Sequence, residues 1–129
     1  MMNQRQQEKI RKRLLDRLDE LRADIQRELR KYDDETYGQI ADRVADPAER
    51  SVADLLVDVN VAEIDRDVGE FREFEAALLR LAGGGYGFCV DCEEPIDKNR
   101  LDRNPAAARC YKCQQTFEDT DRRVHHRTL

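Results

Sequence analysis

The sequence predicts a mainly α-helical protein, in which a long antiparallel two-helix coiled-coil hairpin is followed by a small four-cysteine module with a short C-terminal helix. Three observations predict this fold class. Charged residues make up 40% of the 129 residues, apolar residues recur with helical spacing through two long segments, and four cysteines form two C-x-x-C pairs. With only 6% aromatic residues and no Trp, the chain cannot fill a broad globular core, so we expect an elongated molecule.

The first long segment is amphipathic and is expected to stay helical to about residue 45. Its apolar residues follow one another at spacings of three and four, which places them in one stripe along a helix. They are Ile10, Leu14, Leu18, Leu21, Ile25, Leu29 and Tyr32. Charged residues fill the positions between them. Gly38 weakens this helix near its far end.

A second helix is predicted to start near Asp46. Asp46 reads as its N-cap, Pro47 as its first residue and Glu49 as the acid of a capping box. Its apolar stripe consists of Val57, Val61, Ile64, Val68, Phe71, Phe74, Leu78 and Leu81, and it stops at the glycine run 83–85. Because the turn is short, residues 1–82 should form an antiparallel hairpin, on the order of 50 Å long, with its tip near residues 42–51.

Charge and hydropathy exclude several functions. The net charge of -5 is carried mainly by residues 46–82, which hold 4 basic and 10 acidic side chains, so a generally basic nucleic-acid binder is disfavoured. No apolar run could serve as a signal peptide or span a membrane, and we expect a cytoplasmic protein. In that reducing compartment, a metal explains four cysteines better than disulfides do.

The cysteines have the spacing of a C4 zinc finger within residues 83–129. Cys89 and Cys92 form one pair, Cys110 and Cys113 the other, and 17 residues separate the pairs. Four thiolates fill the coordination shell of one structural Zn²⁺ and leave no open position for water. A redox dithiol pair and a catalytic zinc are the alternatives. His125 and His126 are not needed as ligands and are expected to be solvated.

The acids at the predicted tip, Asp42, Asp46 and Glu49, have two compatible interpretations. Asp46 and Glu49 cap the second helix, or the three acids present carboxylates to a metal ion or basic side chains of a partner. An enzyme is not expected, because the chain has no Gly-rich phosphate loop, no Ser/His/Asp set and no open metal position. The alternative function is a nucleic-acid-binding zinc ribbon, supported locally by five basic residues: Lys98, Arg100, Arg103, Arg109 and Lys112.

The cysteine region resembles one family of bacterial transcription regulators. The stretch that carries this resemblance is Tyr86-Gly87-Phe88-Cys89-x-x-Cys92-x-x-x-Ile96-x-x-x-Arg100-Leu101-x-x-x-Pro105-x-Ala107-x-x-Cys110-x-x-Cys113. It is similar to the finger of the DksA/TraR family, in which the finger follows a long antiparallel coiled coil. The resemblance implies a factor that binds RNA polymerase in its secondary channel through the coiled coil. It would modulate transcription initiation without sequence-specific DNA binding.

The resemblance also assigns residues. The family's tip motif, Asp-x-x-Asp-x-Ala, corresponds to residues 46–51, so Asp46 and Glu49 would act on polymerase at the tip, with Arg50 and Ser51 supporting them. Some members bind ppGpp through basic residues, and the corresponding positions here are Glu73, Asn104 and Gln114. The loss of these phosphate-binding groups predicts weak coupling to ppGpp, and the chain resembles a divergent paralogue. Transcript-cleavage factors also carry acids on a coiled-coil tip, but they lack a finger of this type.

Overall fold

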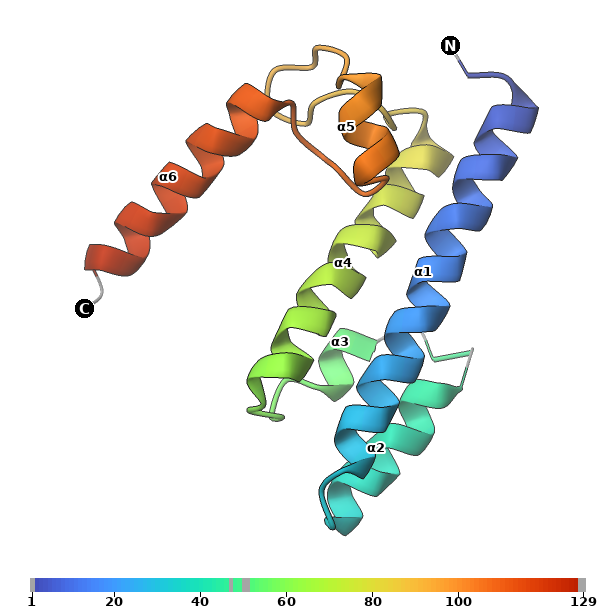
Figure 1. The fold of residues 1–129 in the computed structure, drawn as a ribbon, viewed down its shortest axis with the longest axis vertical. Coiled ribbons are helices and arrows are strands. Elements are labelled where there is room, and N and C mark those ends of the chain that lie inside the picture. The colour runs from blue at the N-terminus through green and yellow to red at the C-terminus, as the bar shows by residue number, and fades with distance from the viewer. Residues whose placement is uncertain (1, 47, 50–51, 128–129) are drawn as a thin grey trace.

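The structure is a computed structural model that describes residues 2–46, 48–49 and 52–127, and side chains as far as residue 122 (Figure 1). Along the described chain the helices are α1 (Gln4–Arg30), α2 (Glu35–Ala45), α3 (Val52–Leu55), α4 (Ala62–Gly83), α5 (Lys98–Arg103) and α6 (Tyr111–Arg127). Within these residues, β-pairing is confined to one isolated antiparallel bridge between Phe88 and Pro95. The prediction of a mainly α-helical protein is confirmed.

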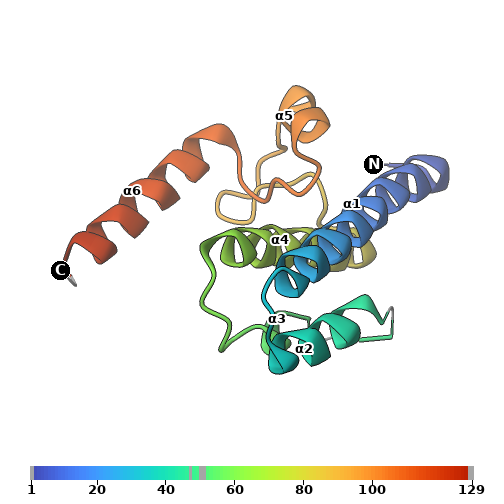
Figure 2. The same cartoon turned by 60° about the horizontal axis from the view of Figure 1, so that its bottom comes forward.

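The core lies between α1 and α4, which run antiparallel and side by side (Figures 1 and 2). Both helices bury the residues of their predicted stripes, because spacings of three and four keep these side chains on one face. The buried members are Leu14, Leu18, Leu21, Ile25 and Leu29 of α1, and Ile64, Phe71, Phe74 and Leu81 of α4. Both predicted stripes therefore meet as expected over these positions.

The first long helix is shorter than predicted. It ends at Arg30 with Lys31 as its C-cap, and α2 begins again after Asp34, whose side chain accepts a hydrogen bond from the Tyr37 amide. The apolar stripe stops at Tyr32, so a continued helix would bring Thr36 into the seam. Instead, α2 turns back along α1. Its buried residues, Ala41 and Val44, pack in the shared core.

The prediction that Asp46 starts the second long helix is wrong. Asp46 is the C-cap of α2, with its backbone amide bonded to the Arg43 carbonyl oxygen, and its side chain accepts from the Ala48 amide at 2.9 Å. Helical structure resumes with the single turn of α3, and α4 starts only at Ala62. Between them Leu56 and Val59 are buried, each with 4% exposure, in turns rather than in a helix. Pro47, Arg50 and Ser51 lie outside the described residues.

These differences change the shape of the hairpin. The antiparallel helices are joined through α2 and α3 and not by a short turn, so the segment around Asp46 lies beside α1 instead of at the far end of a rod. Figure 2 shows α2 and α3 on one side of the α1/α4 pair, with α5 and α6 on the other. The far end of the molecule is formed by the corner between α1 and α2 (Figure 1).

The C-terminal end of α4 is set by glycine, as predicted. Gly84 has a left-handed backbone (φ 84°), and its amide donates to the carbonyl oxygens of Arg80 and Leu81. The cysteine module, residues 83–129, follows this cap. Its Tyr86 and Ala106 belong to the same core cluster as α1 and α4, so a division into two domains at residue 82 stays a prediction. None of the helices in the described residues is long and apolar enough to cross a membrane.

Candidate metal centre and acidic segment

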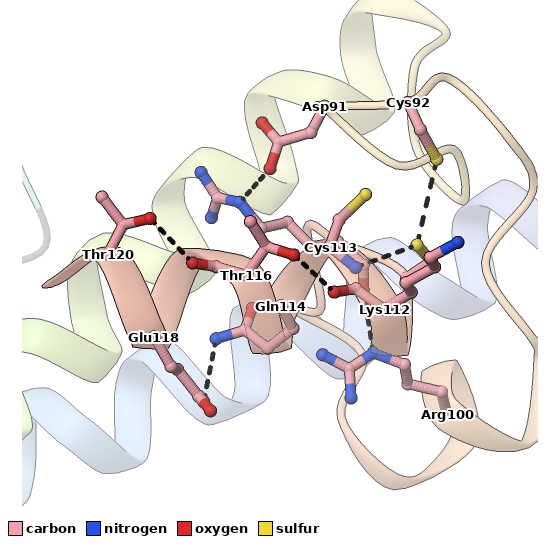
Figure 3. Close-up of polar contacts among 11 residues, drawn as sticks. Asp91, Cys92, Arg100, Lys112, Cys113, Gln114, Thr116, Glu118 and Thr120 are labelled. Atoms are coloured by element: carbon pink, nitrogen blue, oxygen red, sulfur yellow. Dashed lines mark hydrogen bonds and ion pairs between the residues drawn. The ribbon is translucent and has the colours of Figure 1, made fainter. Parts of the chain in front are cut away.

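The four cysteines converge on one point of the cysteine module. Their sulfur atoms all lie within 4.8 Å of one another, and the Sγ atoms of Cys92 and Cys110 are 3.8 Å apart (Figure 3). A tetrahedral zinc site with Zn–S bonds of about 2.3 Å has sulfur–sulfur edges of about 3.8 Å. None of the four sulfurs is in a disulfide. The two C-x-x-C pairs of the sequence therefore form one compact four-sulfur cluster.

Tight turns of the backbone direct the first pair of thiols. Gly87 has φ 88° and Glu93 has φ 66°, so the chain reverses on both sides of the pair. The Cys89 amide donates to the Glu94 carbonyl oxygen at 2.8 Å, and the Glu93 amide returns to the Cys89 carbonyl oxygen at 2.9 Å. Of the four cysteines, Cys89 is the buried one, with 2% exposure. These bonds hold its sulfur on the inner side of the turn.

The second pair is held by the start of α6. Cys110 precedes this helix and Cys113 lies in its first turn, where the Cys113 amide donates to the Cys110 sulfur at 3.4 Å. The two pairs are joined by a backbone bond from the Val90 amide to the Ala108 carbonyl oxygen at 2.9 Å. A helix start has backbone amides without partners inside the helix, and here one of them helps to hold the Cys110 sulfur in place.

The thiols differ in acidity. Burial acts to raise the pKa of Cys89, but backbone amides of Cys92, Cys110 and Asp91 outweigh it and lower that pKa to about 6. The hydrogen bond from Cys113 to the Cys110 sulfur, together with desolvation, raises the pKa of Cys113 to about 12. Four thiolates cannot stay this close without a cation between them. A soft divalent ion that accepts four sulfurs relieves that repulsion, and zinc has this preference.

Arg109, one of the five basic residues considered for nucleic-acid binding, instead makes contacts within the cysteine module. Arg109 pairs with Asp91 at 2.7 Å, and its guanidinium carbon lies 4.0 Å from the centre of the Phe117 ring. Arg100 donates to the Arg109 carbonyl oxygen at 2.8 Å. Figure 3 shows Asp91 and Arg100 on either side of α6, close to the cysteines. Two of the five basic side chains are therefore occupied within the module.

The acidic segment, residues 46–49, is the second candidate site. Asp46 is exposed, whereas the Glu49 side chain is only 19% exposed and pairs with Arg43 at 3.2 Å. The third predicted tip acid, Asp42, pairs with Arg30 at 2.7 Å. The structure thus brings Asp46 and Glu49 into one turn and leaves Asp42 on the surface of α2.

Sequence reasoning missed Arg22, which contacts this segment through its guanidinium group. Arg22 on α1 donates to the carbonyl oxygens of Val44 at 3.3 Å and Glu49 at 3.2 Å. Its position beside Leu21 of the apolar stripe gives no signal of this role, because the contact depends on the backward turn of α2. Only the three-dimensional arrangement places Arg22 opposite a segment more than twenty residues away.

The helical pair and the four-sulfur cluster together define a zinc-finger protein of the C4 type, with one structural Zn²⁺ as the ion that the cluster fits. Residues 84–119 match the family described as prokaryotic dksA/traR C4-type zinc finger. This part of the chain is therefore a zinc finger of the DksA/TraR type.

Similar proteins agree with this assignment over most of the chain. One from Caulobacter vibrioides, named "RNA polymerase-binding transcription factor DksA", is 28% identical over 126 residues, which are 96% of this chain and 83% of the relative. The Haemophilus influenzae protein of that name is 29% identical over 79 residues, 61% of this chain and about half (54%) of the relative's length. The solved structure of transcription factor DksA2 from Pseudomonas aeruginosa matches with a TM-score of 0.59 and 29% identity, and covers 93% of this chain and 88% of that one.

Proposed function

We propose that this protein binds RNA polymerase and regulates transcription initiation without sequence-specific recognition of DNA. The observation that carries the proposal is the similarity to a polymerase-binding factor along 96% of the chain, which includes both the helical pair and the four-sulfur cluster. The proposal involves no catalytic step, since four sulfurs fill a zinc ion's coordination shell. A factor that acts on polymerase works in the cytoplasm, in agreement with the location expected from the sequence.

In the same proposal, the helices enter the secondary channel of polymerase and the acidic segment acts inside it. The exposed carboxylate of Asp46 is available to a basic side chain or a metal ion of the partner. Glu49 becomes available only if its ion pair with Arg43 is exchanged for a partner group. Charged hydrogen bonds of this kind are strong enough to alter the lifetime of a polymerase–promoter complex. Arg50 and Ser51 are assigned supporting roles by the resemblance to the family motif.

The tip assignment predicts a defined loss of effect. The double substitution Asp46→Asn with Glu49→Gln should leave co-purification with core polymerase intact and return the half-life of open promoter complexes to the value without the factor. Asp58→Asn is the matched control, because it removes an exposed acid outside the acidic segment. Unchanged half-lives with the double variant would refute the assignment. Loss of binding itself would mean that these acids dock the protein.

The nucleic-acid-binding alternative receives less support from the module. Arg100 and Arg109 are engaged in internal contacts, which leaves Lys98, Arg103 and Lys112 for phosphates, and neighbouring acids offset these charges. Binding of the full chain to a DNA fragment at rising salt distinguishes the two functions. A steep decrease in affinity, with no binding to polymerase, would favour the alternative.

The proposed function also predicts weak coupling to ppGpp. Two of the positions that correspond to the family's basic residues, Glu73 and Asn104, line a cavity of about 780 Å³ between α1, α4 and the end of α5. Burial, and then the nearby Glu70, raise the pKa of Glu73. Arg17 in the same cavity is already paired with Glu70 and Glu20. The lining as a whole carries five acids against four arginines, so it offers a polyanion no excess of positive charge.

We expect ppGpp to change the effect of this protein on open-complex half-life by less than about twofold. The reason is the repulsion between the ligand's phosphates and the carboxyl groups that line the cavity. The measurement compares open-complex half-lives with and without ppGpp in the presence of the protein. The same comparison without the protein gives the response of polymerase alone, which is subtracted. A change of tenfold that depends on the factor would contradict this expectation.

A further inference from the structure

Arg22 of α1 spans both sides of the acidic segment. Its Nη1 donates to the carbonyl oxygens of Val44 at 3.3 Å and of Asp46 at 3.5 Å, and its Nη2 donates to the carbonyl oxygen of Glu49 at 3.2 Å. The first two oxygens belong to the C-terminal end of α2, where helical carbonyls have no partner within the helix. The third lies on the other side of the turn. One guanidinium thus bridges the end of α2 and the segment that follows it.

The guanidinium is itself held in a fixed place. Its central carbon lies 5.1 Å from the centre of the Phe71 ring, and Phe71 is 1% exposed in the core between α1 and α4. A planar cation that stacks on a buried ring and donates several hydrogen bonds loses little further freedom when it binds the segment. A positive charge at the C-terminal end of α2 also interacts favourably with the helix dipole. The bridge is therefore built from the rigid part of the molecule.

We propose that Arg22 is a positioning residue, which fixes the backbone of the acidic segment so that Asp46 stays exposed while Glu49 is turned toward Arg43. This inference rests on the proposed function only where it predicts an effect on transcription. In that function, the segment meets polymerase already ordered, because its conformation is set before binding. Arg22 itself need not touch polymerase.

The first test uses the free full-length protein. The amides of Asp46, Ala48 and Glu49 donate hydrogen bonds to Arg43 O, Asp46 Oδ1 and Asp46 O. Their hydrogen exchange therefore reports the order of the segment. In Arg22→Gln we expect these amides to exchange about tenfold faster, since the charged hydrogen bonds are lost. Arg22→Lys keeps the positive charge but lacks the planar guanidinium with its several donors. We therefore expect it to restore only part of the slow exchange.

Two references separate positioning from general stability. Arg17→Gln removes an α1 arginine that pairs with Glu70 at 2.5 Å and does not contact the segment, so the three amides should exchange as in the wild type. The core amides of Leu18 and Ile25 report global unfolding. If the segment amides of Arg22→Gln exchange within twofold of the wild type, or accelerate only as much as the core amides do, Arg22 has no positioning role.

The second test measures binding and effect separately. We expect Arg22→Gln to bind core polymerase within about threefold of the wild-type affinity and to lose most of its effect on open-complex half-life. A full effect for Arg22→Gln, with no effect for the variant that lacks both acids, would overturn the functional part of the inference. If the variant without both acids keeps its full effect, the acidic segment is not the acting site. The exchange data then decide the positioning role alone.

Discussion

Removal of zinc is expected to unfold the cysteine module and to leave the helical pair folded. The module has little core of its own: α5 buries no residue, and the β-pairing in the described residues is the single bridge. Structural zinc contributes on the order of 10 kcal/mol to such modules. The helical pair instead keeps the buried stripes of α1 and α4. Amide NMR spectra before and after chelation, with metal content measured in parallel, check this result.

A substitution and a pH series sharpen the zinc prediction. Cys92→Ser should give the spectrum of the chelated protein, whereas Val90→Ser, beside it on the surface with 47% exposure, should keep the module folded. Zinc affinity should fall as the pH falls, because protons compete for the four sulfurs and Cys113 holds its proton most strongly, with a pKa raised to about 12. A module that stays folded without metal would contradict the assignment, as would a zinc content far from one ion per chain.

Phe71→Ala is expected to destabilise the helical pair by about 3–5 kcal/mol, the usual loss for a fully buried aromatic side chain. Phe71 is 1% exposed and is among the largest fully buried side chains. Its removal leaves a cavity between α1 and α4 and withdraws the ring on which Arg22 stacks. Because small domains are stable by only about 5–15 kcal/mol, this loss is a large part of the total free energy of unfolding. Urea unfolding followed by circular dichroism measures the change.

The control for this prediction is on the same helix. Leu79 is 75% exposed on α4, so Leu79→Ala should change the free energy of unfolding by no more than about 0.5 kcal/mol. Phe71→Leu keeps much of the buried volume and should cost less than Phe71→Ala. Equal, small effects of the substitutions at both positions would mean that α1 and α4 do not pack through Phe71.

The parts of the fold that depend on local pattern could be predicted from the sequence. The stripes of α1 and α4 follow from apolar spacing, the end of α4 follows from Gly84, and the metal cluster follows from two C-x-x-C pairs. Each of these signals is contained in a short window of residues. Physical rules that act within such a window, such as helix periodicity and cysteine spacing, do not need the rest of the fold.

The corner between α1 and α2 could not be predicted in this way. Asp34 as an N-cap competes with continuation of the helix, and the balance is settled by the burial of Ala41 and Val44 in the shared core. The sequence Asp46-Pro47 equally suits a helix start and the end of α2. Arg22 was missed for the same reason, because its partners are selected by tertiary packing and not by spacing along the chain.

Helix α1 contacts both the cysteine module and the acidic segment, so it sets the distance between them. Nine residues before Arg22, the Arg13 side chain donates to the Asp102 carbonyl oxygen of the cysteine module at 2.6 Å. Nine helical residues correspond to about 14 Å, so one rigid helix sets the offset between the module and the acidic segment. A partner that binds the cysteine module therefore finds Asp46 at this fixed distance along α1, and not at the far end of the helix. The reach of the protein is thus determined by where α2 turns back and not by how long its helices are.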